Sequence, residues 1–212
     1  MHIIMGTLVE RADGRFYNTS VLLDDRGRII GKYRKIKLWD GEKDYITPGT
    51  ELSVLETELG RIGLLICWDL AFPELAKGLA NQGAQLIFCP SYWLYGDKYG
   101  MLSSDEQRRR VPPLDTESIF VETCTRARAI ENEVFFVYIN GWGEVELDGY
   151  GDRLIGKTQI ATPFYGTVAQ ASDREELTMA EVDTDLLELA EEVYQIHRDS
   201  HGLNEAIPGG SG

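Results

Sequence analysis

The stretch from residue 61 to residue 88 constrains the fold more than any other part of the sequence. Ile62–Cys67 has the apolar character of a strand, Leu70–Asn81 carries apolar residues at helical spacing, and Gln85–Cys89 is again continuously apolar. A strand, a helix and a strand in this order form a crossover unit, which places the two strands in parallel. The stretch therefore predicts an α/β fold with helices outside a mixed sheet.

Other segments have the composition of strands or helices and complete this prediction. The expected strands are Ile3–Val9, Thr19–Leu23, Ile29–Arg34, Ser53–Leu55, Val134–Asn140, Leu154–Ile160, Thr167–Gln170 and Thr178–Val182. The turn residues Asp24–Gly27 predict a hairpin, and helices are expected at about Thr116–Asn132 and at Asp185–Glu192. No repeat or linker divides the chain, so we expect a single domain over residues 1–205 and a flexible tail or linker over residues 206–212.

The charge of the chain argues against nucleic acid as a partner. The 212 residues carry a formal net charge of −14, whereas phosphate binding needs a basic patch. The basic run Arg108–Arg110 follows two acidic residues and is most simply the solvated face of a helix. With 43% hydrophobic residues, the chain has enough apolar material for a sizeable core.

The cysteines and the apolar runs indicate a cytoplasmic protein that does not bind a membrane. Three cysteines, an odd number, fit no disulfide framework and are typical of a reducing compartment. The first residues have the wrong flanks for a signal peptide, and no apolar run approaches the roughly 18 residues of a membrane span.

Cys67 stands where a predicted strand ends and a turn leads into a helix. A thiolate at that point would face the first N–H groups of the helix and its positive dipole, which lower a thiol pKa. Strand ends also lie at the rim of a sheet, where α/β proteins bind ligands. The alternative is that Cys67, after three apolar residues, is a small buried hydrophobe.

A cysteine nucleophile needs a base and a group that stabilises an oxyanion. The histidines stand near the ends of the chain, at His2, His197 and His201, so neither a cysteine–histidine pair nor a zinc site is indicated. Lysine and glutamate remain as candidate catalytic groups. The alternation of a strand places Tyr33, Lys35 and Lys37 on one face, and Glu42 lies in the loop that follows. By themselves, a strand lysine and a loop glutamate are ordinary solvated charges.

Five motifs in order resemble the nitrilase, or carbon–nitrogen hydrolase, superfamily. They are "YRKIKLWD", "EKDYITPG", "GLLICWDLAFPE", "GAQLIFCPSYW" and "RARAIENEVFFVYING", and the resemblance runs from about Ile4 to about Tyr194. It implies a four-layer α-β-β-α sandwich and a Glu-Lys-Cys catalytic set, without a metal ion or an organic cofactor.

The resemblance also implies roles for individual residues. Cys67 of "ICWD" corresponds to the nucleophile, and Lys35 of "YRK" would stabilise the oxyanion together with the backbone N–H of Trp68. Glu42, before the "Y-x-x-P-G" turn, would position that lysine or a proton in transit. For substrate binding we expect Tyr92, Trp93 and Asn140, from the loops around Trp93–Tyr99 and Asn140–Gly151. The aromatic residues of these loops could equally belong to a dimer contact or the core.

The form of the cysteine motif favours one kind of reaction. "CWDLAFPE" looks more like amidase and carbamoylase members of the family than true nitrilases, so we expect a small linear amide or N-carbamoyl amine as substrate. Four acidic residues of the same loops, Asp97, Glu144, Glu146 and Asp148, would attract a cationic group on it. Family members commonly form homodimers or larger homo-oligomers, and Leu186–Ser200 is the expected contact. A non-catalytic scaffold and acyl transfer to an amine are the alternatives.

One element of the family pattern does not occur in the sequence. The family's general-base glutamate lies on an N-terminal segment that precedes the part equivalent to Ile3–Val9, and Glu10 is at the wrong end of that strand to replace it. We therefore expect an N-terminally truncated sandwich with an uncovered sheet edge and an apolar face, and weak or no activity for the chain alone. A fragment of a longer enzyme is the favoured explanation; a piece completed by another chain and an inactive relative are the others.

Overall fold

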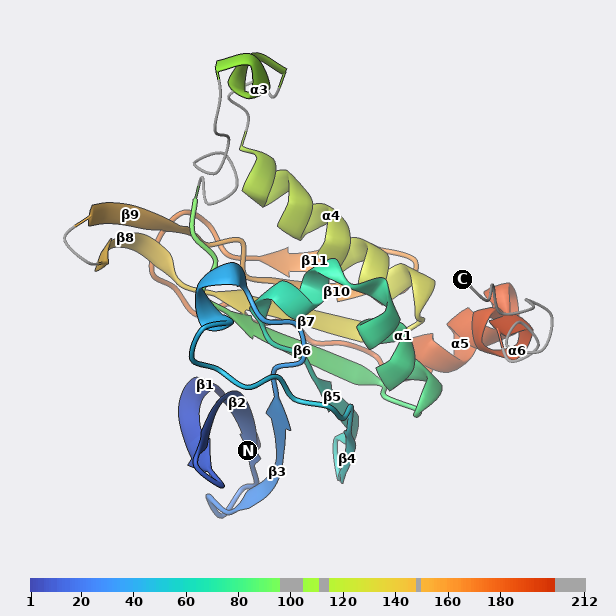
Figure 1. Ribbon diagram of the computed structural model, residues 1–212. Coiled ribbons are helices and arrows are strands. Elements are labelled where there is room, and N and C mark those ends of the chain that lie inside the picture. Colours follow the sequence, from blue (N-terminus) through green and yellow to red (C-terminus); the bar gives the residue numbers. More distant parts are fainter. Residues whose placement is uncertain (96–104, 111–114, 148–149, 201–212) are drawn as a thin grey trace, which may run out of the picture.

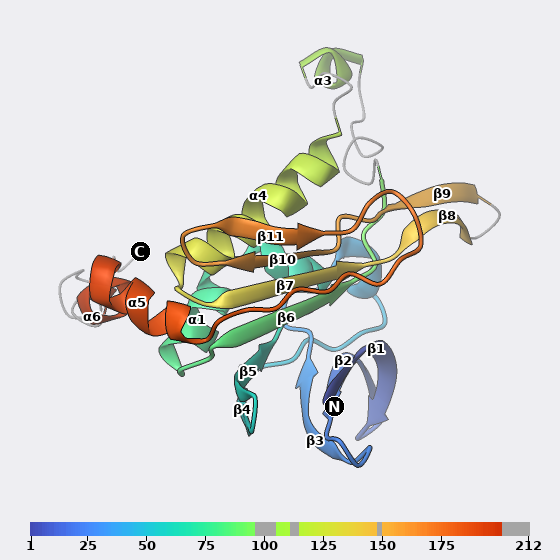
Figure 2. The same ribbon diagram turned by 180° about the vertical axis from the view of Figure 1, so that it is seen from behind.

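The computed structural model describes residues 1–95, 105–110, 115–147 and 150–200 (Figure 1). Two β-sheets lie face to face, and helices cover the outer face of the larger sheet (Figures 1 and 2). The α/β fold predicted from the sequence is confirmed.

The smaller sheet has the order β1-β2-β3 and is antiparallel throughout. Its strands are β1 (Ile3–Ala12), β2 (Arg15–Leu23) and β3 (Ile29–Arg34). The predicted hairpin joins β2 to β3: Asp24 accepts hydrogen bonds from the backbone N–H groups of Arg26 and Arg28, and Gly27 has a φ of 75°. Glycine occupies this left-handed position without a steric penalty.

The larger sheet has the order β11-β10-β7-β6-β5-β4. Its strands are β4 (Val54–Thr57), β5 (Gly60–Leu64), β6 (Leu86–Ser91), β7 (Phe135–Asn140), β10 (Gln159–Thr162) and β11 (Gly166–Gln170). β5, β6 and β7 are parallel neighbours, as the crossover pattern predicts, and the remaining pairs are antiparallel. A separate hairpin, β8 (Trp142–Leu147) and β9 (Tyr150–Ile155), extends from one end of this sheet (Figure 1).

Helices α1 (Pro73–Asn81) and α4 (Thr116–Glu131) lie on the face of the larger sheet that is turned away from the smaller one, and α5 (Asp185–Tyr194) and α6 (Ile196–Ser200) lie at one end of that sheet (Figures 1 and 2). The other helical segments are α3 (Asp105–Arg110) and the 3₁₀ turns η1 (Asp40–Glu42) and η2 (Cys67–Ala71). None of the helices in the described part of the chain is long and apolar enough to cross a membrane.

Helix α1 shows why the crossover packs tightly onto the sheet. Pro73 begins the helix, where its missing N–H costs nothing, and Leu75 and Leu79 are buried on the inner face. A Cβ atom on Gly63 of β5 would lie 2.9 Å from a methyl carbon of Leu79. A glycine at this place lets the helix approach the strand closely and sets the position of the chain that follows β5.

The core lies on both faces of the larger sheet. Leu22 and Tyr33 of the smaller sheet belong to the same buried cluster as Ile87 of β6 and Val121 of α4. Burial of apolar side chains on both faces is the reason why β6 and β7 are continuously apolar rather than alternating.

Three of the four expected layers are formed by the described residues. α1 and α4 form one layer, and the two sheets form the next two; in the described ranges no helix covers the outer face of the smaller sheet (Figure 1). On the outer face of β1, apolar side chains are accordingly exposed: Met5 is 43% exposed and Leu8 41%. These exposed side chains agree with the apolar face expected from the sequence, whereas truncation of the sandwich stays a prediction.

Several predicted boundaries were wrong. The chain between β9 and β10 breaks at Gly156 and Lys157, both of which have positive φ, so Leu154–Ile160 is not one strand. Thr178–Val182 is extended but forms no strand, because no neighbouring strand pairs with it in the described part of the chain. β5 ends at Leu64, and a 3₁₀ turn separates it from α1.

Candidate active site

A cavity of about 310 Å³ opens between the two sheets, next to Cys67. Its walls come from segments far apart in the sequence: Thr7, Asn18, Lys35, Trp39, Gly41, Glu42, Tyr45, Ile66, Cys67, Trp68, Pro90, Tyr92, Trp93 and Leu94. Six of the seven positions proposed from the sequence are among them. A thiol, an ammonium and a carboxylate thus share one largely aromatic cavity, which is the composition of a ligand site.

Cys67 lies in a strained turn. The preceding residue, Ile66, is extended at φ −136° and ψ 117°, whereas Cys67 has a φ of 48°. A non-glycine residue in this left-handed region costs of order 1 kcal/mol or more and persists only where surrounding contacts hold it. The partly buried side chain of Cys67 lines the cavity and also packs against the edge of the core.

Asp69 supplies the contacts that hold this turn. Its fully buried carboxylate accepts hydrogen bonds from the backbone N–H of Ile66 at 2.9 Å, the hydroxyl of Tyr33 at 2.8 Å and the backbone N–H of Lys37 at 2.8 Å. Burial raises the pKa of Asp69 to about 6, against the effect of these three bonds. One carboxylate therefore ties the turn after β5 to both sides of Lys35.

Lys35 is buried, not solvated as an ordinary strand lysine would be. Its side chain is 2% exposed, and its Nζ donates to Oε2 of Glu42 at 2.5 Å. Its backbone N–H donates to the carbonyl of Asn18, and its carbonyl accepts from Gly49. A buried ammonium needs such a partner, and the position of this one in the wall of the cavity leaves it facing the space beside Cys67.

Glu42 is held by three donors. Lys35 donates to it, the side-chain amide of Asn18 donates to Oε1 at 2.7 Å, and the backbone N–H of Trp39 donates to Oε2 at 2.8 Å. Burial raises the pKa of Glu42, but the hydrogen bonds and the charge of Lys35 outweigh it and the pKa is lowered overall. Glu42 is thus an ionised carboxylate that fixes Lys35.

The pKa of Cys67 moves in the direction opposite to the sequence-based prediction. Burial raises it, while the charge of Lys35 and a backbone hydrogen bond from Tyr92 lower it by less. The predicted effect of a helix dipole is missing because α1 begins only at Pro73, beyond the 3₁₀ turn. The thiol is therefore predominantly protonated at neutral pH in the absence of substrate.

Tyr92 and Trp93 line the cavity, as the sequence-based prediction has it, and Asn140 does not. The side-chain oxygen of Asn140 accepts from the backbone N–H of Trp93 at 2.9 Å, and its Nδ2 donates to the carbonyl of Trp93 at 3.1 Å. Both ends of the amide are used to hold Trp93 in place. Asn140 is a positioning residue and not part of the cavity wall.

Aromatic rings form one wall of the cavity. The ring of Trp68 lies 4.8 Å from that of Trp39 and 5.7 Å from that of Trp93, measured between centroids. The indole N–H of Trp93 donates to Glu117 of α4 at 2.6 Å, which fixes the ring from the helix side. Rigid aromatic rings provide apolar contact area at little entropic cost, so this wall suits a small ligand with an apolar part.

The acidic loop residues of the sequence-based prediction do not contribute to the cavity described here. Glu144 and Glu146 are exposed on β8 and are not lining residues. Asp97, Tyr99 and Asp148 lie outside the described residues. The expected attraction of a cationic group by these loops therefore has no support in the described part of the chain.

The motif "RARAIENE" braces the cysteine turn from the helix layer. Arg128 of α4 donates to the carbonyl of Leu70 in η2 at 3.1 Å and pairs with Glu131 at 2.8 Å. Asn132 donates to the carbonyl of Arg128 at 3.0 Å. The motif thus acts on the site indirectly, by fixing the turn that carries Cys67.

Sequence reasoning missed Asn18 and the structural role of Asp69. Asp69 had a signal, since a carboxylate within an otherwise apolar run has to find donors when it is buried. Asn18 had none, because its contact with Glu42 joins residues 24 positions apart.

Comparison with known proteins agrees with the geometry. The sequence profile described as "Carbon-nitrogen hydrolase" matches residues 1–192. An N-carbamoylputrescine amidase from Solanum tuberosum is 32% identical over 203 residues, which cover 93% of this chain and 65% of the relative. An (R)-stereoselective amidase from a Pseudomonas species is 30% identical over 199 residues, which cover 93% and 63%.

A solved structure has the same fold. The crystal structure of a carbon–nitrogen hydrolase from Helicobacter pylori G27 is 31% identical and superposes with a TM-score of 0.78, covering 96% of this chain and 70% of that one. Four curated relatives, the Pseudomonas amidase among them, are matched over 51% to 63% of their own length, so the chain spans about half to two thirds of them.

Proposed function

Because this chain belongs to the carbon–nitrogen hydrolase family, we propose that the protein hydrolyses a non-peptide carbon–nitrogen bond through a thioester on Cys67. The substrate class is a small linear amide or an N-carbamoyl amine. The observation that carries the proposal is the convergence of Cys67, Lys35 and Glu42 on one cavity of about 310 Å³.

In the first half of the reaction, the sulfur of Cys67 attacks the carbonyl carbon of the substrate. The proton of the thiol passes to the nitrogen of the substrate, a C–S bond forms, and the carbonyl oxygen becomes an oxyanion. The buried ammonium of Lys35 and the backbone N–H of Trp68 stabilise that charge, which develops in a cavity with a largely aromatic wall. The C–N bond then breaks, and the nitrogen leaves with that proton as ammonia or an amine.

In the second half, water attacks the thioester carbonyl and the C–S bond breaks. One proton of the water returns to the sulfur of Cys67, and the acyl group leaves as a carboxylic or carbamic acid. The same oxyanion stabilisers act again. Because a thiolate is strongly nucleophilic and a thioester is readily hydrolysed, a cysteine divides one difficult step into two easier ones.

Glu42 positions Lys35 in this scheme. Its three hydrogen bonds from Lys35, Asn18 and Trp39 leave it poorly placed to accept the proton of the thiol. Glu42 is the only residue with a carboxylate among the described residues that line the cavity. A positioned acid–base group typically contributes about 10²- to 10⁴-fold to the rate, so we expect the 212-residue chain by itself to turn over slowly.

The test is ammonia release from a panel of small linear amides and N-carbamoyl amines. We expect weak release that Cys67→Ala abolishes and that Cys124→Ala, a matched change at the half-buried cysteine of α4, leaves unaltered. Equal release by the chain and its Cys67→Ala variant would contradict the proposal. Release at an ordinary enzymatic rate would refute the expectation of slow turnover, and product captured by hydroxylamine in preference to water would identify acyl transfer.

We further propose that the protein acts in the cytoplasm as a homodimer or a larger homo-oligomer. All three cysteines are free thiols, which fits a reducing compartment. Exposed apolar side chains on α5, Leu189 at 48% and Val193 at 57%, offer a surface for self-association. Light scattering coupled to gel filtration tests this, and a monomer at micromolar concentration would contradict it.

A further inference from the structure

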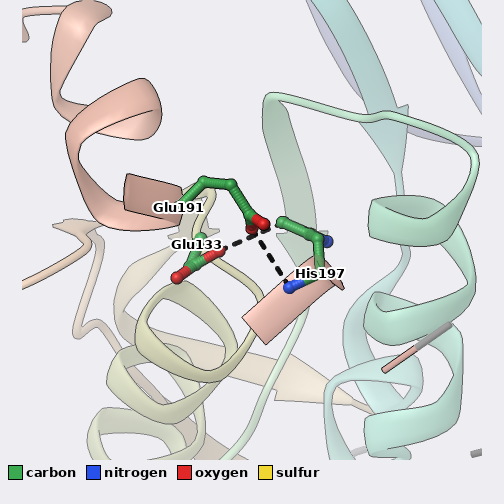
Figure 3. A group of neighbouring side chains, drawn as sticks. All are labelled: Glu133, Glu191 and His197. Atoms are coloured by element: carbon green, nitrogen blue, oxygen red, sulfur yellow. Dashed lines mark hydrogen bonds and ion pairs between the residues drawn. The ribbon is translucent and has the colours of Figure 1, made fainter. Parts of the chain in front are cut away.

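Three side chains that can bind a metal ion meet at the end of the larger sheet where α5 and α6 lie. Glu133 follows the end of α4, Glu191 belongs to α5 and His197 to α6, and Figure 3 shows them directed toward one another. One ligand atom of each lies within 4.8 Å of the others. These residues are separate from the cysteine cavity, whose lining includes none of them.

The carboxylate of Glu133 is the unusual member of this cluster. The residue is 3% exposed, yet neither carboxylate oxygen has a hydrogen-bond partner among the described residues. Nε2 of His197 lies 3.7 Å from Oε2 of Glu133, which is too far for a hydrogen bond. A buried carboxylate without donors is costly, so its position calls for a compensating cation or a proton.

Glu191 adds a second carboxylate to the same space. Its oxygens accept from the backbone N–H groups of His197 at 3.1 Å and Arg198 at 3.2 Å, in the first turn of α6. Gln195, between the two helices, has a φ of 58°, and this left-handed residue turns α6 back over Glu191. Each oxygen of a carboxylate has two lone pairs, so these bonds leave acceptor capacity directed at Glu133.

Two facing carboxylates repel each other unless a charge between them is neutralised. A divalent cation bound between the carboxylates would neutralise both and use the histidine as a third ligand.

The donor set and its spacing suit a first-row transition metal. Two carboxylate oxygens and an imidazole nitrogen are ligands for Zn²⁺ and its neighbours, whereas Ca²⁺ and Mg²⁺ prefer oxygen alone. At Zn–ligand distances of about 2.0–2.2 Å, two ligands of a tetrahedral site lie about 3.4 Å apart. The 3.7 Å between His197 and Glu133 is close to this value, so small side-chain movements complete the site.

The cluster is also accessible. Glu133, Glu191 and His197 line an open cleft of about 610 Å³, together with Arg61 and Gln85 among others. An ion can therefore reach the buried carboxylate, and water from the cleft can provide a fourth ligand.

We propose that Glu133, Glu191 and His197 bind a divalent first-row transition-metal ion that fastens α5 and α6 to the junction of α4 and β7. The role is structural, because the site shares no residue with the cysteine cavity. The spacing of histidine and cysteine in the sequence indicated no metal site. The ligands here are separated by up to 64 positions in the chain, so spacing could not show them.

The experiment uses the full 212-residue chain, freed of metal by chelation and then titrated with Zn²⁺ or Co²⁺. We expect one equivalent to bind, with a Co²⁺ spectrum of oxygen and nitrogen ligands and without the near-ultraviolet band of a thiolate. Glu133→Gln and His197→Ala should each weaken binding at least tenfold. Glu188→Gln, a matched change at an exposed residue of the same cleft, should leave it unaltered.

Thermal unfolding gives an independent readout. Zn²⁺ should raise the midpoint of the wild-type chain and of Glu188→Gln, and should not raise that of Glu133→Gln. The metal-free Glu133→Gln variant should fold, since it removes one of the two facing carboxylate charges. Glu191→Gln removes the other and serves as a second variant in the same measurement. A midpoint that depends on pH but not on Zn²⁺ would show that a shared proton neutralises Glu133 and Glu191, and it would overturn the proposal. Metal binding that is weakened by none of Glu133→Gln, Glu191→Gln and His197→Ala would overturn it as well.

Discussion

Replacing Tyr33 with phenylalanine removes one oxygen atom from the network that positions Lys35 relative to Cys67. The hydroxyl of Tyr33 donates to Asp69 at 2.8 Å and accepts from the backbone N–H of Ile36 at 3.3 Å. Tyr33 is 2% exposed and Asp69 is fully buried, so water cannot replace the lost partner without opening the core.

The structure sets the size of the expected effect. A hydrogen bond to a charged acceptor contributes about 1.5–3 kcal/mol, and the long bond from Ile36 adds at most about 1 kcal/mol. Asp69 keeps its two backbone donors, so the variant should still fold. We expect Tyr33→Phe to lower the free energy of unfolding by about 2–3 kcal/mol at pH 8, and the melting midpoint by about 4–12 °C.

The pH dependence has a definite sign. The pKa of Asp69 is about 6 in the folded chain, above its ordinary value of 3.8, so stability falls as pH rises between these values, where the unfolded chain ionises first. The bond from Tyr33 lowers that pKa, and its loss raises it further. The destabilisation by Tyr33→Phe should therefore be smaller at pH 4.5, where Asp69 is protonated, than at pH 8.

Urea denaturation at pH 4.5 and pH 8 measures both differences. Tyr17→Phe is the matched control, because Tyr17 lies on the neighbouring strand, is 8% exposed, and its hydroxyl makes no hydrogen bond within the described part of the chain. A Tyr33→Phe effect no larger than that of the control, or one that does not grow with pH, would refute the assignment of Asp69 as the centre of this network.

Three further predictions concern neighbouring parts of the structure. Asn140→Ala should destabilise the chain by about 2–4 kcal/mol in urea denaturation, because it leaves the buried backbone groups of Trp93 unpaired; an effect under about 1 kcal/mol would contradict this. Glu10→Gln should lower the free energy of unfolding by about 1 kcal/mol at pH 7, since the guanidinium of Arg34 and the ammonium of Lys32 lower the pKa of Glu10 from 4.5 to about 2. This loss should shrink as pH falls from 4.5 toward 2. A loss that stays constant down to pH 3.5 would be inconsistent with the ion pair. Lys35→Met should slow alkylation of Cys67 by iodoacetamide about tenfold or more at pH 8, because the charge of Lys35 lowers the pKa of the thiol. An unchanged rate, measured by mass mapping, would show that Lys35 does not act on the thiol.

Much of the fold follows from patterns that are local in the chain. The parallel order of β5, β6 and β7 follows from the strand–helix–strand pattern, because a crossover that returns to the same sheet allows no other direction. The hairpin at Asp24–Gly27 follows from turn residues that accept its backbone angles. In the same way, the sequence places Cys67 close to the end of a strand, and it lies three residues beyond the end of β5, at the rim of the sheet.

The roles of the polar residues required the tertiary structure. Lys35 and Glu42 stand out in the sequence only through a family resemblance, since an isolated strand lysine is usually solvated. Asn140, expected in the cavity wall, instead binds the backbone of Trp93, which is 47 positions away. The sequence does not indicate that Asp69 joins the turn after β5 to β3, because that role depends on Tyr33 lying opposite it in the folded chain.

The amino-acid sequence alone determined most of the strands and helices, how the central strands run, and which thiol lies at the edge of the sheet, since periodicity and turn chemistry act over a few residues. The tertiary structure alone decided which charges are buried, what each is paired with, and that Glu133, Glu191 and His197 meet. Burial and pairing depend on contacts between residues distant in the chain, and a local pattern carries no record of those distances.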